Sequence, residues 1–178
     1  MKNKRCFKIT KNCGFTLIEL LVVVSIITIL TSAVVPSFTS YLARQSIKQA
    51  REQVKSDLRT IQNNAMSNSV LPGETSSNNV YWGLYFKNNS PEYYYFASPN
   101  VIGISNCPLF QNSNQKFLLP LDTVSNGDYC VIFSSIDGSS IGSAFLTLKS
   151  VNQEVYECIN INTYGLITNG TWNGSVCT

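Results

Sequence analysis

The segment from Phe15 to Val35 constrains this chain of 178 residues more than any other. Its 21 residues include a single charged side chain, that of Glu19. At about 1.5 Å per residue, a helix of this length would span roughly 30 Å, the thickness of a bilayer core. Lys and Arg precede the segment without any acidic residue. This pattern predicts a membrane-crossing helix whose N-terminus stays in the cytoplasm, with everything after Val35 outside.

Glu19 distinguishes between three interpretations of this segment. A cleavable signal peptide would use Leu20–Leu30 as its apolar core and be cut near Ser32-Ala33, whereas a plain anchor would stay intact. Neither has a use for a carboxylate near the end of an apolar helix, where insertion is costly. Glu19 is therefore a candidate functional residue, and the alternative is that its side chain only extends to the membrane interface.

The apolar segment opens behind its basic leader with the string GFTLIE at residues 14–19. Over residues 11–36 the sequence resembles the N-terminal signature of type IV prepilins and type II secretion pseudopilins. The resemblance implies that a prepilin peptidase removes residues 1–14 by cutting between Gly14 and Phe15, and that Phe15 is then N-methylated. Gly14 suits such a cut because it has no side chain to keep the protease from the backbone.

The resemblance also implies assembly roles for two further residues. Within a filament the new ammonium of Phe15 needs a partner, because an unpaired buried charge is costly, and Glu19 of a neighbouring subunit would neutralise it and set the axial register. Pro36 stands where long pilin helices often carry a proline. Because it lacks a backbone donor and collides with the carbonyl of Ser32, we expect a kink or local melting there. The alternative is that Pro36 ends the helix.

Residues 37–66 contain neither Gly nor Pro and are predicted to continue the helix. Apolar side chains recur every three or four residues, which predicts one face packed on a globular head. These residues are Ile47, Ala50, Val54, Leu58, Ile61 and Ala65. A basic stripe follows another face and comprises Arg44, Lys48, Arg51, Lys55 and Arg59. The stripe either faces solvent or lipid headgroups, or contacts acidic neighbouring heads or nucleic acid. DNA is possible but not indicated, since few aromatic residues interleave with the stripe.

Residues 67–178 alternate short β-rich runs with turns and predict a head of about five to seven antiparallel strands. The expected strands are 79–86, 92–97, 116–121, 129–136, 143–150, 155–161 and 164–168. Asn126-Gly127 and Asp137-Gly138 are turn signals, and Pro120 should place its strand at an edge or split it. The fold class is therefore α+β, with a long N-terminal helix, membrane-spanning in its first half, packed on a C-terminal antiparallel β-sheet head.

Four of the six cysteines follow the membrane segment and could form disulfides in an exported head. They are Cys107, Cys130, Cys158 and Cys177, whereas Cys6 and Cys13 leave with the leader. Three pairings are possible. We prefer Cys107–Cys130 with Cys158–Cys177, because each bridge would then tie down a long irregular segment, at about 3 kcal/mol in the loop-entropy model. The alternative is four free buried thiols.

The composition argues against an enzyme, a cofactor or a metal site. The chain contains no His, which removes the commonest general base and a common metal ligand. The acidic residues of the head are scattered. Asp122 and Asp128 share one turn-rich loop but lack the dense oxygen ligands of a calcium site.

The sequence therefore indicates a pilin-like structural subunit, and we expect a minor one. Looser similarities to H-type minor pseudopilins and related minor pilins lie in residues 56–65, the strand YWGLYF and the string ECININTYGLIT. The implied partners are the prepilin peptidase, other pilin or pseudopilin subunits, the membrane and, indirectly, an assembly platform protein with its ATPase. The protein would cross the cytoplasmic membrane once and later join an extracytoplasmic filament. Its segments would be the leader 1–14, the assembly helix 15–36, the stalk 37–66 and the head 67–178.

Two other functions stay open. The chain could be a tip or binding subunit that contacts DNA, a surface or cargo through its head. It could also be a membrane-anchored exported enzyme, against which the absence of His and the dispersed acidic residues argue.

Overall fold

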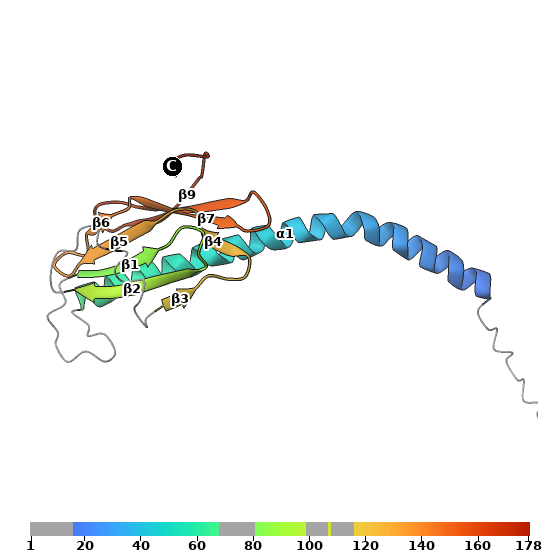
Figure 1. The fold of residues 1–178 in the computed structure, drawn as a ribbon, viewed down its shortest axis with the longest axis horizontal. Coiled ribbons are helices and arrows are strands. Elements are labelled where there is room, and N and C mark those ends of the chain that lie inside the picture. The colour runs from blue at the N-terminus through green and yellow to red at the C-terminus, as the bar shows by residue number, and fades with distance from the viewer. Residues whose placement is uncertain (1–15, 68–80, 99–106, 108–115) are drawn as a thin grey trace, which may run out of the picture. The chain divides into compact units, whose positions relative to one another are not determined.

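One helix, α1 (Leu17–Met66), runs through the first described segment of the chain (Figure 1). The computed structural model describes residues 16–67, 81–98, 107 and 116–178. The chain divides into two units between Thr39 and Ser40, and α1 runs through the boundary. The backbone stays helical through Pro36, so this residue does not end the helix. In the described part of the chain no helix is both long and apolar enough to cross a membrane.

The second half of α1 presents the predicted apolar face to the β-sheets. Each of its six predicted members is at most 2% exposed: Ile47, Ala50, Val54, Leu58, Ile61 and Ala65. They share one core with residues of both sheets, among them Trp82, Phe133, Leu148 and Ile159. The prediction of an α+β fold in which an amphipathic helix packs on a β-rich head is confirmed.

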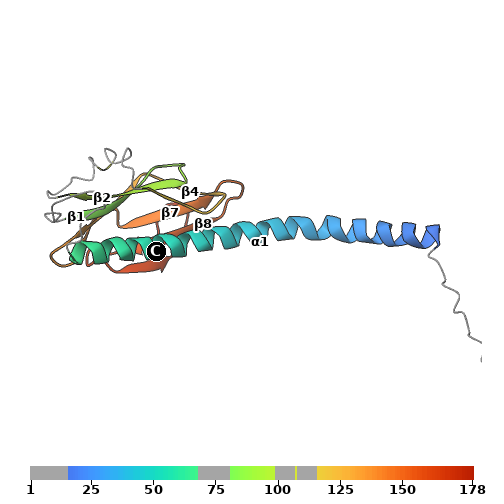
Figure 2. The same ribbon diagram turned by 90° about the horizontal axis from the view of Figure 1, so that it is seen from below.

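The strands form two antiparallel sheets (Figure 2). The first has the order β3-β2-β1-β5-β6, and the second has the order β4-β7-β8-β9. The strands are β1 (Tyr81–Phe86), β2 (Glu92–Ser98), β3 (Lys116–Leu118), β4 (Thr123–Ser125), β5 (Tyr129–Ser134), β6 (Ser140–Gly142), β7 (Phe145–Ser150), β8 (Tyr156–Ile161) and β9 (Ile167–Gly170). The first two expected strands are confirmed and pair as an antiparallel hairpin, with Tyr81 opposite Ser98 and Phe86 opposite Tyr93.

The expectation of five to seven strands in one sheet is wrong, because the described residues form nine strands in two sheets. The additional strands, β4 and β6, have three residues each. The expected strand 116–121 is cut to β3, which stops two residues before Pro120 and lies at a sheet edge. The last strand, expected at 164–168, begins only at Ile167, after a turn held by bonds between Asn162 and Leu166.

The centre of the first sheet is buried on both faces, which explains why five of the six residues of β1 are buried. One face contributes Trp82, Leu84 and Phe86 to the core shared with α1. The other face carries a second, smaller cluster, comprising Tyr85, Phe96, Cys107, Cys130 and Ile132. The aromatic run of β2 divides accordingly, with Tyr93 in the first core and Phe96 in the second.

Candidate functional site

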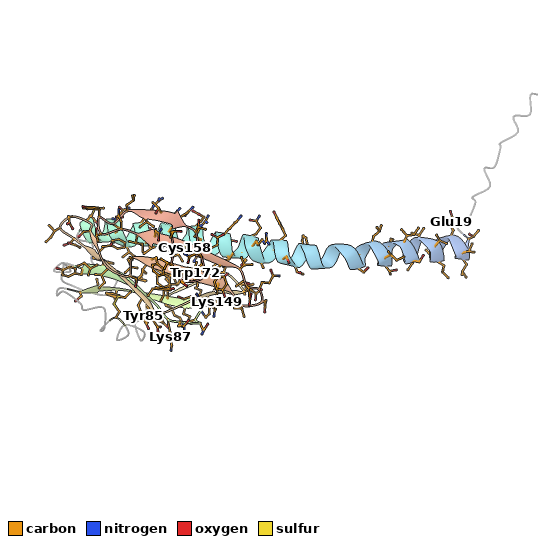
Figure 3. The ribbon with its side chains drawn as sticks, turned by 90° about the horizontal axis from the view of Figure 1, so that it is seen from above. Glu19, Tyr85, Lys87, Lys149, Cys158 and Trp172 are labelled. Atoms are coloured by element: carbon orange, nitrogen blue, oxygen red, sulfur yellow. A yellow bond between two sulfur atoms is a disulfide. The ribbon has the colours of Figure 1, made fainter. Side chains whose placement is uncertain are left out.

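The first turn of α1 carries the predicted assembly residue Glu19, whereas the predicted cleavage residues Gly14 and Phe15 lie outside the described residues. Glu19 is exposed and lies at the N-terminal end of the described helix (Figure 3). Thr16 directly precedes α1, and its hydroxyl oxygen accepts a hydrogen bond from the backbone N–H of Glu19 at 3.3 Å. Thr16 thereby satisfies one of the free donors at the helix N-terminus.

Thr16 and Glu19 have the spacing of a capping box, in which Ser or Thr is followed three residues later by Glu or Gln. The capping-box pattern is visible in the sequence, which predicts for Glu19 an assembly role in addition. A carboxylate in the first turn also interacts favourably with the helix dipole, by about 0.3–1 kcal/mol. Glu19 can therefore favour the start of α1 while its side chain stays exposed to another chain.

The turns that follow Glu19 expose an apolar surface on the helix. Large aliphatic side chains between Leu17 and Leu30 are 44–82% exposed, on all sides of the helix. A helix that is apolar all round is normally buried among other helices or in lipid. This half of α1 therefore requires an apolar environment that the chain itself does not supply in its described residues.

Two disulfides lie in the head, joining Cys107 to Cys130 and Cys158 to Cys177. These are the two pairings between cysteines that are near in sequence. The second bridge ties the C-terminal tail to β8, and Trp172 pairs with Cys177 through an isolated β-bridge (Figure 3). Gly170 lies opposite Cys158 in the sheet, where a side chain would collide with both sulfur atoms of this bridge.

The middle of the basic stripe forms ion pairs within the chain. Arg51 Nη1 lies 2.7 Å from Glu157 Oε2 of β8, and each of these side chains is 17% exposed. The Glu52 carboxylate forms ion pairs with both Arg51 and Lys55. The hydrogen bond from Arg51 lowers the pKa of Glu52. The interpretation that the stripe is simply a solvated face is therefore wrong for Arg51, which binds α1 to the second sheet.

A polar group inside the helix–sheet interface joins α1 to β2. The Tyr93 hydroxyl donates a short hydrogen bond to the Asp57 carboxylate, and the Gln53 amide donates to the Tyr93 oxygen at 3.2 Å. Burial raises the pKa of Asp57, although the hydrogen bond from Tyr93 opposes this shift. Burial and the adjacent carboxylate also raise the pKa of Tyr93. The group fixes the helix on the sheet.

Asp122 and Asp128, considered above for calcium, have separate surroundings. Asp128 accepts hydrogen bonds from the Tyr85 hydroxyl at 3.2 Å and from the backbone N–H of Asn88 at 2.9 Å. Tyr85 and the neighbouring Lys87 are labelled in Figure 3. Among the described residues, no three His, Cys, Asp or Glu side chains gather where they could hold a metal ion.

Comparison with known proteins gives one match, and it falls on the N-terminal segment. The family model described as the prokaryotic N-terminal methylation motif matches residues 9–35. Neither the curated proteins nor the solved structures include a match to the chain. The matched residues include Gly14, Phe15 and Glu19. The chain therefore carries the N-terminal signature of type IV prepilins and pseudopilins.

Proposed function

We propose that this chain is a minor structural subunit of a type IV pilus or a type II secretion pseudopilus, and that it polymerises through its N-terminal helix. The methylation motif at residues 9–35 is the observation that carries the proposal, because it indicates a pilin-like subunit processed by prepilin peptidase. A long helix that ends in a β-rich head supports it, since the helix can pack with others while the head stays outside.

Processing would come first. The chain would enter the cytoplasmic membrane through residues 15–35, and the peptidase would cut between Gly14 and Phe15 on the cytoplasmic side. Phe15 would then be N-methylated. The apolar surface between Leu17 and Leu30 would lie in lipid before assembly and among other helices afterwards, so it would keep an apolar environment in both states.

Assembly would depend on Glu19. Its exposed carboxylate would pair with the ammonium of Phe15 on a neighbouring subunit. Because the cost of leaving either charge unpaired in an apolar environment is several kcal/mol, the pair selects one register more than it adds to net stability.

Mass spectrometry of the protein from membranes tests the processing step. We expect an N-terminus at Phe15 that carries one additional methyl group. Gly14→Val should block the cut, because a branched side chain at this position obstructs the protease. An intact Met1 terminus in the unaltered protein, or a terminus near Val34, would exclude processing as a prepilin.

Incorporation into filaments tests the role of Glu19. Glu19→Val should leave membrane insertion intact and strongly reduce the subunit in sheared filaments, and Glu19→Gln should do the same because it removes only the charge. Thr16→Ala is the matched control, since it removes the helix cap but keeps the carboxylate. If Thr16→Ala impaired incorporation as much as Glu19→Val, the helix start would matter and the charge pair would not.

A second candidate function is that of a tip or binding subunit. The end of the head beside the C-terminal end of α1 favours it. Ile136 and Tyr164 occupy turns there and are 84% and 85% exposed. Gln62 of α1 fixes these turns by donating to the carbonyls of Gly138 at 2.9 Å and Gly165 at 3.1 Å. Replacing Ile136 and Tyr164 with Ser should abolish binding of cargo or a surface without changing incorporation, if this function is correct.

A further inference from the structure

The globular unit has an end, which we call the base, formed by residues 41–48 of α1, the loop 119–122 and residues 149–154 at the end of β7 and in the loop after it. The Ser46 hydroxyl donates a hydrogen bond to the carbonyl of Leu121 at 2.8 Å. The backbone N–H of Val151 donates to the carbonyl of Asp122 at 2.9 Å. The loops that follow β3 and β7 thus meet at one end of the sheets and are tied to the helix (Figure 1).

The base exposes apolar side chains where loops normally carry polar ones. Leu121 is 89% exposed and Val151 is 60% exposed. On α1, Tyr41 and Leu42 are 56% and 49% exposed. Apolar side chains gathered at an exposed surface mark an interaction site. An aromatic residue beside aliphatic ones is typical of segments at a membrane–water interface.

Three cations lie in the same segments of the chain, namely Arg44 and Lys48 on α1 and Lys149 two positions before Val151. None of them forms an ion pair with any residue whose placement is described, whereas Arg51 and Lys55 further along the stripe are both paired. Arg44 and Lys48 border a hollow of about 440 Å³. The other residues that line it are Glu154, Val155, Tyr156, Glu157 and Trp172.

The charges of the base favour an anionic partner. Its three cations, Arg44, Lys48 and Lys149, exceed its two acidic side chains, Asp122 and Glu154, by one positive charge. Glu157, which also lines the hollow, is already paired with Arg51. Glu154 lines the same hollow, so an anion beside Arg44 and Lys48 would meet a net excess of one positive charge.

The spacing of charges along the chain sets the level at which the base meets the membrane. No charged residue lies among the 24 residues between Glu19 and Arg44. As a helix they span about 36 Å, which is more than the hydrocarbon core of about 30 Å and less than the whole bilayer of about 40–45 Å. Glu19 and Arg44 can therefore lie in opposite headgroup layers of the same membrane.

We propose that the base docks on the anionic headgroups of the membrane in which the N-terminal helix is inserted. Arg44, Lys48 and Lys149 would bind lipid phosphates, while Leu121 and Val151 would enter the boundary between headgroups and acyl chains. This inference rests on the proposed function, because it requires residues 15–35 to be in the bilayer. Docking would hold the head at the membrane before the subunit joins a filament.

The test uses the full chain in lipid nanodiscs that contain phosphatidylcholine alone or a mixture with phosphatidylglycerol. A fluorophore on Leu121→Cys, in a Cys6→Ser and Cys13→Ser background, reports contact through quenching by lipids with a spin-labelled headgroup. The matched control carries the label on Ile136→Cys, in the turn that follows β5. We expect strong quenching at Leu121 in the anionic discs, weaker quenching in phosphatidylcholine, and none at Ile136.

Charge variants test whether the cations of the base bind lipid headgroups or whether the label merely lies near the bilayer. Each Gln substitution at Arg44, Lys48 or Lys149 should lower the ratio of docked to undocked heads about fivefold, as expected for one basic residue at an anionic surface. Arg59→Gln is the control, because this exposed cation of the same stripe lies beyond the base. Near-ultraviolet circular dichroism confirms that each variant keeps its core.

The outcomes distinguish this inference from the proposed function. An inserted chain whose Leu121 label is unquenched in both kinds of disc would overturn the docking and leave the proposed function standing. A chain that does not insert would overturn the proposed function itself. Protection of Leu121 that appears only when a second pilin subunit is added would assign the base to a protein partner and also overturn the docking.

Discussion

Removing the Cys158–Cys177 disulfide should lower the free energy of unfolding of the globular unit by about 3 kcal/mol. The two cysteines are 19 positions apart, and the loop they close contains β9 and the C-terminal tail. In the chain-entropy model the bridge acts on the unfolded chain, so the estimate depends on the loop length alone. A loss of this size is a large fraction of the roughly 5–15 kcal/mol of a typical domain.

The assay is equilibrium unfolding of the full chain in detergent micelles, with Trp82 as the probe. Trp82 is 1% exposed in the core between the helix and the sheets, and a Trp172→Phe background removes the second indole. The perturbation is the double substitution of Cys158 and Cys177 by Ala.

The other disulfide supplies the matched control. Cys107 and Cys130 are 23 positions apart, so the model predicts that their removal costs the same within about 0.2 kcal/mol. A loss below about 1 kcal/mol for the Cys158–Cys177 bridge, with about 3 kcal/mol for the control, would refute the reasoning. The tail would then be held by its own backbone bonds, such as the 2.6 Å bond from Thr171 N–H to Thr178 O.

Three further predictions concern the helix–sheet interface and one turn. Burial raises the pKa of Asp57, so its contribution to stability is complete below the unfolded value of about 3.9 and is lost as pH rises through the folded value. Asp57→Asn should remove this loss, and denaturation at pH 4 and pH 7 checks it. A double-mutant cycle with Arg51→Met and Glu157→Gln should give a coupling of about 0.5–3 kcal/mol, and a value near zero would contradict an interaction across the interface. Gly165→Ala should lower stability by about 1–3 kcal/mol, because φ is +79° and the added carbon meets a carbonyl of the β5–β6 turn. Gly174→Ala, with open space around it, should lower stability less, and thermal melts of the two variants check this difference.

Local sequence patterns predict α1 well because its core face depends on helical periodicity alone. Residues from Ile47 to Ala65 recur at the spacing of one face, and any sheet surface that covers this face buries them all. The short strands β4 and β6 could not be predicted in this way. Three residues cannot show alternation, and each strand exists because a longer neighbour, β7 or β5, supplies its hydrogen bonds.

The burial of both faces of β1 was equally inaccessible from the sequence. Its string YWGLYF does alternate, but alternation predicts one buried face and one exposed face. The second face is covered by Phe96 and by the bridge between Cys107 and Cys130, which a distant segment supplies. Only the folded chain shows that this segment reaches β1.

The residues of the candidate site likewise fall into two kinds, those that a local sequence pattern predicts and those that only the fold brings together. The string at residues 14–19 is local, and its chemistry and spacing could be recognised without a fold. The ion pair between Arg51 and Glu157 joins residues 106 positions apart, so no local pattern contains it. Adjacent residues on a helix do not face each other, so the sequence does not predict contact between Arg51 and Glu52. The long side chain of Arg51 nevertheless reaches it at 2.9 Å.

The two halves of the basic stripe differ because of where the second sheet ends. Strand β8 begins at Tyr156, so Glu157 is its first acidic residue and lies within reach of Arg51. Before Tyr156 the chain forms a loop, and no described carboxylate of that loop pairs with Arg44 or Lys48. A cation left unpaired costs little at a surface that water or an anionic headgroup can reach, but it would be costly inside a packed interface. The register of β8 on α1 therefore decides which basic residues stabilise the fold and which stay available to a partner outside it.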